Sequence, residues 1–114
     1  MASPEPALTV RVSPTAAAAL ADIWQWNAER YGESHADEYV GFLRSAIQQL
    51  PSLYKLGRPV TSRPGFHYRM IRRRAKGHGH IAVYRFHDTV IDVLHVFHSA
   101  QEWQAKLADE TPGE

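Results

Sequence analysis

The chain has 114 residues, of which 44% are hydrophobic and 22% charged, and its formal net charge is +1. A chain of this length forms one domain and buries roughly two-thirds of its unfolded surface, enough for a single core. It contains no cysteine, which excludes disulfides and thiolate metal sites, and its apolar runs fall well short of the roughly 20 residues that a membrane helix needs. The lack of cysteine fits a reducing compartment, and we expect no membrane partner.

The two ends of the sequence differ in composition from the rest. Residues 1–6 carry neither the basic start nor the apolar run of a signal peptide, so we expect a frayed leader there. Residues 110–114 are polar and are expected to be a frayed tail. Residues 7–109 then form the single domain.

The first elements are a short strand and a helix. Leu8–Val12 alternates apolar and polar residues, which predicts a strand. Ser13 followed by Pro14 is typical of a helix start, and Gly32 of a helix end. Apolar residues recur between them at helical spacing, with Trp24 on the stripe that we expect to face the core.

A second helix follows almost at once. Ser34 and Asp37 have the spacing of a capping box, and Pro51 is expected to end the helix. A link this short predicts an antiparallel helical hairpin. Residues 51–65 contain five Pro or Gly and read as an ordered loop, with Leu53 and Leu56 tucked against the helices.

The second half of the chain predicts three strands and a helix. The strands are Phe66–Arg73, His80–Phe86 and Val90–Phe97, with a tight hairpin between the last two. Ser99 is expected to cap the last helix, which Trp103 pins to the sheet.

The predicted order is therefore β-α-α-β-β-β-α. Strands that follow a helical hairpin indicate an α+β fold, with the hairpin on one face of a mostly antiparallel four-stranded sheet and a C-terminal helix. The other face of such a sheet is either exposed to solvent, covered by the last helix, or covered by a partner.

Charge is unevenly distributed along this order. No Asp or Glu occurs between Glu38 and Asp88, a stretch that holds ten of the 13 Lys and Arg and four of the seven His. Six acids precede the stretch and six follow it. A field of this kind attracts a polyanion or an acidic protein surface.

Arg72, Arg73, Arg74 and Lys76 form the densest basic cluster. On a regular strand, Arg72 and Arg74 would share one face and Arg73 would take the other. One interpretation is a solvated hairpin tip that protects a sheet edge from aggregation. The other is an anchor for phosphates or acidic side chains, which the lack of nearby acids favours.

The histidines allow several interpretations. His78 and His80 share one side of a strand, as chelation needs, but no spacing here matches a zinc pattern, so we expect exposed histidines and no metal or other cofactor. On a regular strand His95 follows Ile91 and Val93 on an apolar face, where a packed histidine is expected. His98 then points the opposite way.

Several motifs together resemble the ParE/RelE superfamily of toxins from bacterial type II toxin–antitoxin pairs, and the ParE branch most. They are the opening strand with Ala-Asp-Ile-Trp at 21–24, the Tyr-Gly helix end at 31–32, and Leu-Gly-Arg-Pro-Val at 56–60. The most specific stretch is 81–103, with Ala-Val-Tyr-Arg-Phe, a turn, Val-Ile-Asp-Val-Leu-His-Val-Phe-His and Ser-Ala-Gln-Glu-Trp. The basic link at 72–80 is longer than is usual in this superfamily.

The resemblance implies a small cytoplasmic toxin that a cognate antitoxin neutralises by folding its disordered C-terminal segment across the toxin, in a hetero-oligomer. ParE-like members inhibit DNA gyrase without catalysis of their own. The combination of charge and resemblance gives this set of residues for binding the target or the antitoxin: Arg69, Arg72, Arg73, Arg74, Lys76, His78, His80, Arg85, His98 and Trp103.

The alternative is a RelE-like, ribosome-dependent mRNA endonuclease. Cleavage at a ribose 2′-hydroxyl needs a base, an acid and cations for the phosphate. His98, Tyr84, Arg85 and Arg72 contain such groups, although the Lys and Arg set of efficient RelE-type nucleases is not recognisable. Trp26 lies off the apolar stripe and is either exposed or at an interface.

Overall fold

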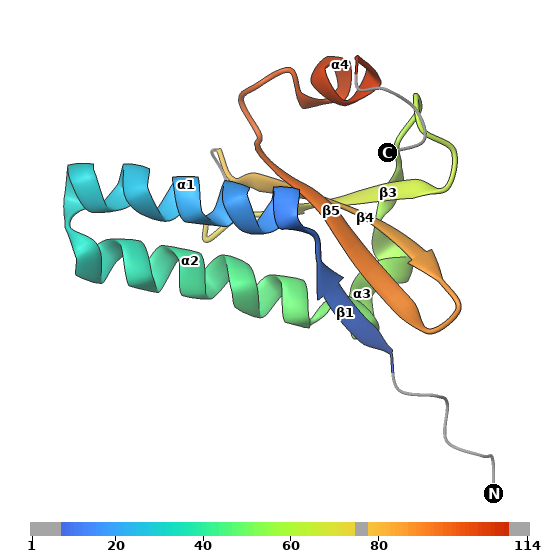
Figure 1. Cartoon of the computed structure of the whole chain (residues 1–114), viewed down its shortest axis with the longest axis horizontal. Coiled ribbons are helices and arrows are strands. Elements are labelled where there is room, and N and C mark those ends of the chain that lie inside the picture. The colour runs from blue at the N-terminus through green and yellow to red at the C-terminus, as the bar shows by residue number, and fades with distance from the viewer. Residues whose placement is uncertain (1–7, 75–77, 110–114) are drawn as a thin grey trace, which may run out of the picture.

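The computed structural model describes residues 8–74 and 78–109, and its longest elements are two antiparallel helices, α1 (Pro14–Tyr31) and α2 (Glu33–Gln48). The Ser13 hydroxyl caps α1 by accepting a hydrogen bond from the Ala16 amide at 3.0 Å, as predicted. The predicted capping box of α2 is wrong. Gly32, at φ 94°, is the one residue between the helices, and α2 begins directly after it. The hairpin extends well beyond the sheet in Figure 1.

The sheet consists of β1 (Thr9–Val12), β2 (Arg58–Pro59), β3 (Phe66–Ile71), β4 (His80–His87) and β5 (Val90–His98). Their order is β1-β5-β4-β3-β2, with β1 parallel to β5 and the other pairs antiparallel. This confirms the α+β fold. The fifth strand was not predicted, because β2 has only two residues and its second is a proline, which cannot donate to the sheet.

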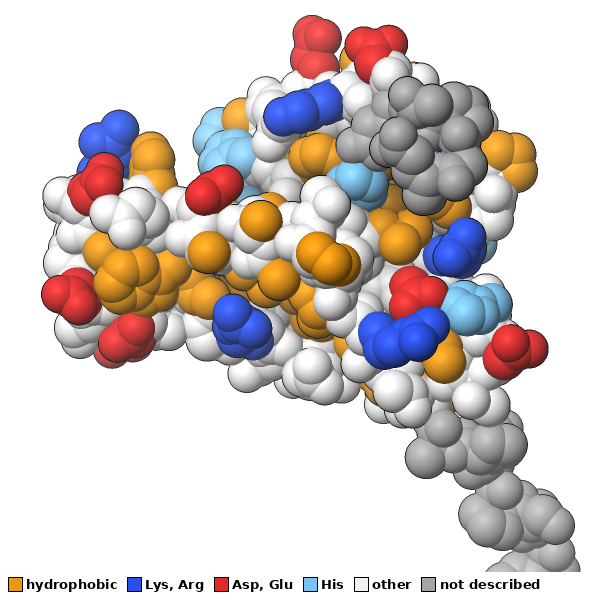
Figure 2. Space-filling view, in the orientation of Figure 1, with side chains coloured by type: hydrophobic (Ala, Val, Ile, Leu, Met, Phe, Trp, Pro, Cys, Tyr) orange, Lys and Arg blue, Asp and Glu red, His pale blue; other side chains and the backbone are white. Residues whose placement is uncertain are grey.

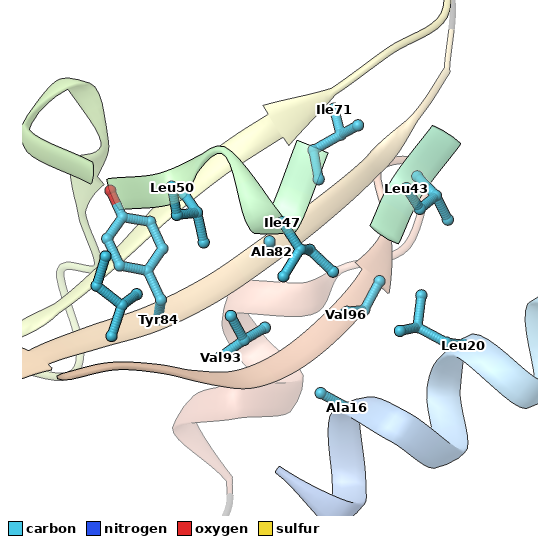
Figure 3. Close-up of a cluster of buried hydrophobic side chains, with 11 residues drawn as sticks. Ala16, Leu20, Leu43, Ile47, Leu50, Ile71, Ala82, Tyr84, Val93 and Val96 are labelled. Carbon is cyan, nitrogen blue, oxygen red and sulfur yellow. The ribbon is translucent and has the colours of Figure 1, made fainter. Parts of the chain in front are cut away.

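The main core fills the space between the hairpin and the sheet (Figure 3). Each helix contributes one apolar stripe, and β4 and β5 contribute alternate residues. The fully buried side chains include Leu20, Leu43, Ile47, Tyr84 and Val93.

Trp24 is not part of this core, contrary to prediction. Its side chain is partly buried at the outer seam of the hairpin, where the indole nitrogen donates a hydrogen bond to Asp37 Oδ1 at 2.8 Å. The tryptophan therefore joins α1 to α2.

An irregularity in β5 changes which side chains face the hairpin. Val83 lies opposite His95, whereas the next residue, Tyr84, lies opposite Val93, so Leu94 is an extra residue. A bulge of this kind shifts the alternation by one position. As a result His95 does not share a face with Val93, as a regular strand would require, and instead stacks on Phe97 at 5.1 Å on the opposite face.

The segment after α2 contains two short turns, α3 (Leu50–Leu53) and the 3₁₀ turn η1 (Tyr54–Leu56). Pro51 does not end α2, which stops at Gln48. It lies in the first turn of α3, where a missing amide proton costs little. The hydroxyl of Tyr84 donates to the Tyr54 carbonyl and fixes this segment to the sheet. Leu56 is 68% exposed and does not tuck inward as predicted.

The second face of the sheet is covered in part by α4 (Trp103–Ala108). Trp103 and Leu107 pack there with Val60, Ile81 and Phe97 in a separate small core. The last helix was predicted, but the expected cap at Ser99 is wrong, because α4 begins only at Trp103. The Ser99 hydroxyl instead accepts a hydrogen bond from the Gly79 amide at 2.8 Å. None of the described helices has the length and apolar character needed to cross a bilayer.

Candidate functional site: the basic end of the sheet

Most of the predicted binding residues meet at one end of the sheet. The last residue of β3, Ile71, lies opposite His80 at the start of β4, and His80 lies opposite His98 at the end of β5. The chain segments that leave β3 and enter β4 are therefore held together at this point. We call the following residues the basic end: Arg72, Arg73, Arg74, His78, His80 and His98. Lys76 lies outside the described residues, and Arg69 lies on β3 just before this end.

The three consecutive arginines do not alternate as predicted. The strand ends at Ile71, two residues earlier than expected, and Arg73 and Arg74 lie in a bend. All three are exposed, and the guanidinium carbon of Arg73 lies 5.8 Å from the ring centre of Phe42 on α2. Contact with an aromatic face orients a guanidinium and leaves its N–H groups available.

His80 is buried, contrary to the prediction of an exposed loop histidine. Its side chain is 8% exposed, and its Nδ1 atom is hydrogen-bonded to the Tyr39 hydroxyl at 2.6 Å. Burial, with a smaller contribution from His98, lowers the pKa of His80 to about 4. Burial also raises the pKa of Tyr39, against the opposing charge of Arg73. Both groups are therefore neutral at pH 7 and join α2 to the sheet.

His98 is exposed, as is His78. Its ring centre lies 5.2 Å from that of His80 and 5.6 Å from that of His78. Its Nδ1 atom accepts a hydrogen bond from the Ala100 amide at 3.0 Å. Among the described residues no three His, Asp or Glu side chains converge as a metal ion requires.

A hollow of about 480 Å³ lies beside the basic end, between it and α1. Its walls include Asp22, Ile23, Trp26, Tyr39 and His98. Trp26 is 49% exposed, which agrees with its position off the apolar stripe. In Figure 2 histidine side chains (pale blue) lie on the upper part of the molecule, next to the hairpin. Sequence reasoning missed the hollow, because only the fold brings α1 and the end of β5 together.

Two predicted binding residues lie elsewhere. Arg85 is at the opposite end of the sheet, where its Nη2 atom lies 3.9 Å from Asp92 Oδ2. Trp103 is 8% exposed and packs edge-on against Tyr68 at 4.6 Å, on the face away from the hairpin. Any effect of Trp103 on binding therefore acts through the position of α4.

The four residues of the alternative nuclease set are not brought together. Tyr84 is 1% exposed, and its hydroxyl is hydrogen-bonded to a backbone carbonyl. Arg85 follows His80 by five residues on the same strand, a separation of about 16 Å at 3.3 Å per residue. His98 and Arg72 share the basic end, but an acid–base pair around one phosphate is absent among the four residues.

Comparison with known proteins identifies the family. A model described as the ParE toxin of the type II toxin–antitoxin system parDE matches residues 10–103. This chain belongs to the ParE toxin family. The match covers both long helices and α3, every strand except the first residue of β1, and the start of α4.

Individual relatives agree with the family assignment. The chain is 30% identical over 98 residues to Toxin ParE1 of Mycobacterium tuberculosis (strain CDC 1551 / Oshkosh), covering 84% of this chain and 94% of that protein. It is also 30% identical over 98 residues to Toxin ParE1 of Caulobacter vibrioides, covering 85% and 95%. A solved structure titled "Chromosomal ParDE TA system from P. aeruginosa" has the same fold, with a TM-score of 0.69 at 20% identity, covering 80% of this chain and 95% of that one.

Proposed function

We propose that this ParE-family toxin inhibits DNA gyrase by docking on it, and that a cognate antitoxin neutralises the toxin by covering the same basic end. The observation that carries the proposal is the concentration of exposed arginine at one end of the sheet. Arg73 and Arg74 form no ion pair with any described residue, whereas the arginines at the opposite end do. A concentrated positive field of this kind favours an acidic partner surface.

The dispersal of the nuclease residues supports docking over catalysis. Positioning alone leaves most of a hydrolytic barrier in place when the acid, the base and the phosphate clamp are not assembled. A docking toxin spreads its interaction over a charged surface, whereas a nuclease concentrates its rate in one acid–base residue worth roughly 10²- to 10⁴-fold.

The target is tested with purified toxin in two assays. Supercoiling by gyrase at modest salt should be inhibited, or cleaved DNA should accumulate. Primer-extension mapping of mRNA on translating ribosomes should show no new cuts. Codon-specific cuts that appear with the toxin and disappear with the antitoxin would instead establish the nuclease function.

A pair of variants separates the two functions in cells. His98→Ala should reduce toxicity less than combined replacement of Arg72, Arg73 and Arg74 by Ala. Complete loss of toxicity in a folded His98→Ala protein would support catalysis.

The antitoxin is tested by co-expressing the product of the neighbouring small reading frame, which should restore growth. Failure to restore growth would contradict the neutralisation proposal.

A further inference from the structure

The outer edge of β3 is only half occupied. The short strand β2 pairs with β3 at Tyr68 and His67, and no described strand continues this pairing beside Arg69–Ile71. The chain turns away at η1, where Leu56 is exposed instead of pairing. An open sheet edge offers backbone groups to another extended chain.

The hydrogen bonds identify which residue offers its backbone at this edge. The Phe66 amide donates to the Arg63 carbonyl at 3.0 Å and the Phe66 carbonyl accepts from Val60 at 2.9 Å, both on the side away from β4. In an antiparallel ladder, backbone groups point alternately to one neighbour and the other. The backbone amides and carbonyls of Tyr68 and Met70 therefore point to the same outer edge. Tyr68 meets β2, whereas the amide and carbonyl of Met70 face outward, where no strand of the described chain lies.

A hollow adjoins this edge on the hairpin side. It has a volume of about 180 Å³, and its lining includes Phe42, Ala46, Leu53 and Ile71. The lining also includes Arg69 and Arg72, which we call the rim. A closed apolar cavity of about 150 Å³ holds a benzene molecule, so this open hollow has room for one large apolar side chain. On the other face, Met70 is 37% exposed.

The charge around the hollow restricts which kind of chain can bind at this edge of β3. Arg69 and Arg72 both belong to the lining of the hollow, and Arg72 is followed by the exposed Arg73. A second copy of this chain would bring its own arginines against these, because residues 39–87 contain no acid. Such like-charge contacts disfavour self-pairing. An extended segment with an apolar residue flanked by acids fits both the hollow and the rim.

We propose that the antitoxin adds a short extended strand to β3 at Met70, with an apolar side chain in the adjoining hollow and acidic side chains on the arginines at its rim. This inference rests on the proposed neutralisation by an antitoxin. Main-chain hydrogen bonds hold such a strand, and alternate side-chain pockets select its sequence. Only about two backbone hydrogen bonds are gained, so charge and the hollow supply the rest.

The test is amide hydrogen exchange on the full-length toxin, with and without the product of the neighbouring reading frame that restores growth. The Met70 amide should exchange at least about 10-fold more slowly in the complex, because it gains a backbone acceptor. The amides of Arg69 and Ile71 already face β4, so their exchange should change little. These two amides are the internal control.

Two variants at one position provide a second test. Met70→Pro removes the outward amide without removing a bond to β4, and edge strands tolerate proline. It should weaken antitoxin binding by about 10-fold. Met70→Leu keeps the amide and a similar side chain and should bind within about 2-fold of the original protein. If Met70→Pro does not fold, the exchange measurement on the unmodified protein still decides.

The outcomes separate this inference from the proposed function. A neutralising antitoxin that leaves the Met70 amide unprotected would overturn strand addition and leave neutralisation intact. Lack of any binding would overturn both. Concentration-dependent protection of Met70 in the toxin alone would identify a second copy as the occupant, and protection by gyrase instead of the antitoxin would identify gyrase.

Discussion

Charged side chains are arranged differently at the two ends of the sheet. At the end beside the β4–β5 hairpin, Asp92 accepts from Arg11 Nε at 3.1 Å, lies 2.5 Å from His87 Nε2 and is near Arg85. Burial would raise the pKa of Asp92, but the hydrogen bonds with His87 and Arg11 together lower it. At the basic end, Arg73 and Arg74 lie exposed in a bend, and neither forms an ion pair with a carboxylate of the described residues.

On the proposed function, the paired end serves the stability of the domain and the basic end serves a partner. Charges that neutralise one another within the fold contribute to its stability and leave a weak external field. Charges of one sign that remain together repel one another in the free protein and are relieved only when a partner binds. The four predictions below test this division, from the largest expected effect to the smallest.

The largest effect is expected on antitoxin affinity. Replacing Arg72, Arg73 and Arg74 by Gln should weaken binding about 30- to 100-fold at low salt, since each rim charge contributes up to about 1 kcal/mol. The matched control, Arg11→Gln with Arg85→Gln, removes charges at the other end and should change the dissociation constant by less than about 3-fold. Titration calorimetry at two salt concentrations measures both. Equal losses from the two sets would contradict the division.

The second effect is a loss of stability in mild acid that arises at His80. In the folded protein its pKa is about 4, whereas the unfolded chain takes up this proton near pH 6.5. The unfolded state therefore binds more protons between these values, and stability falls as the pH falls. Between pH 7.5 and pH 5 this histidine should remove about 2 kcal/mol of unfolding free energy.

The control for this effect is His80→Asn, which keeps an oxygen near the position of Nδ1 but does not titrate. Urea denaturation at both pH values should show the variant losing about 2 kcal/mol less than the original protein over this range. Identical pH dependence in the two proteins would mean that His80 is not held neutral by burial.

The fold was largely predictable because its signals are local. Apolar spacing predicted both long helices, and alternation with turn residues predicted four of the five strands. The errors have particular causes. Gly32 replaced a side-chain cap, and the extra Leu94 reversed the expected facing of His95, which no spacing rule detects in a sequence that alternates regularly.

The site was predictable in part. The acid-free stretch indicated the arginines of the basic end, because their sequence neighbours remain close in the fold. The partnership of Tyr39 with His80 and the hollow beside Trp26 were not predictable, since each joins residues far apart in the chain. Arg85 was included on charge and resemblance, and its carboxylate partner comes from the next strand.

The third effect should appear at the paired end. Asp92→Asn removes a carboxylate with only 16% of its side chain exposed and leaves Arg11 and His87 without their partner. It should cost about 1 kcal/mol of stability at pH 7. Because the pKa of Asp92 is lowered in the folded state, its contribution is present above the unfolded pKa and disappears as the pH falls. The difference from the original protein, measured by urea denaturation, should therefore shrink towards pH 3. A constant difference would exclude an electrostatic origin.

The smallest effect is one of sign, and it compares the two ends directly. Arg11→Gln removes a charge that has a carboxylate partner, so it should lower stability by about 0.3–0.5 kcal/mol. Arg74→Gln removes the same charge from a group of like charges, so it should raise stability by a few tenths of a kcal/mol. Both differences should diminish in 1 M salt, where the screening length is about 3 Å. Replicate thermal denaturation of the two variants at low and high salt resolves opposite shifts in melting temperature. If Arg74→Gln also destabilised the protein at low salt, the arginines of the basic end would contribute to the stability of the fold. The proposal that they are kept for binding a partner would then be wrong.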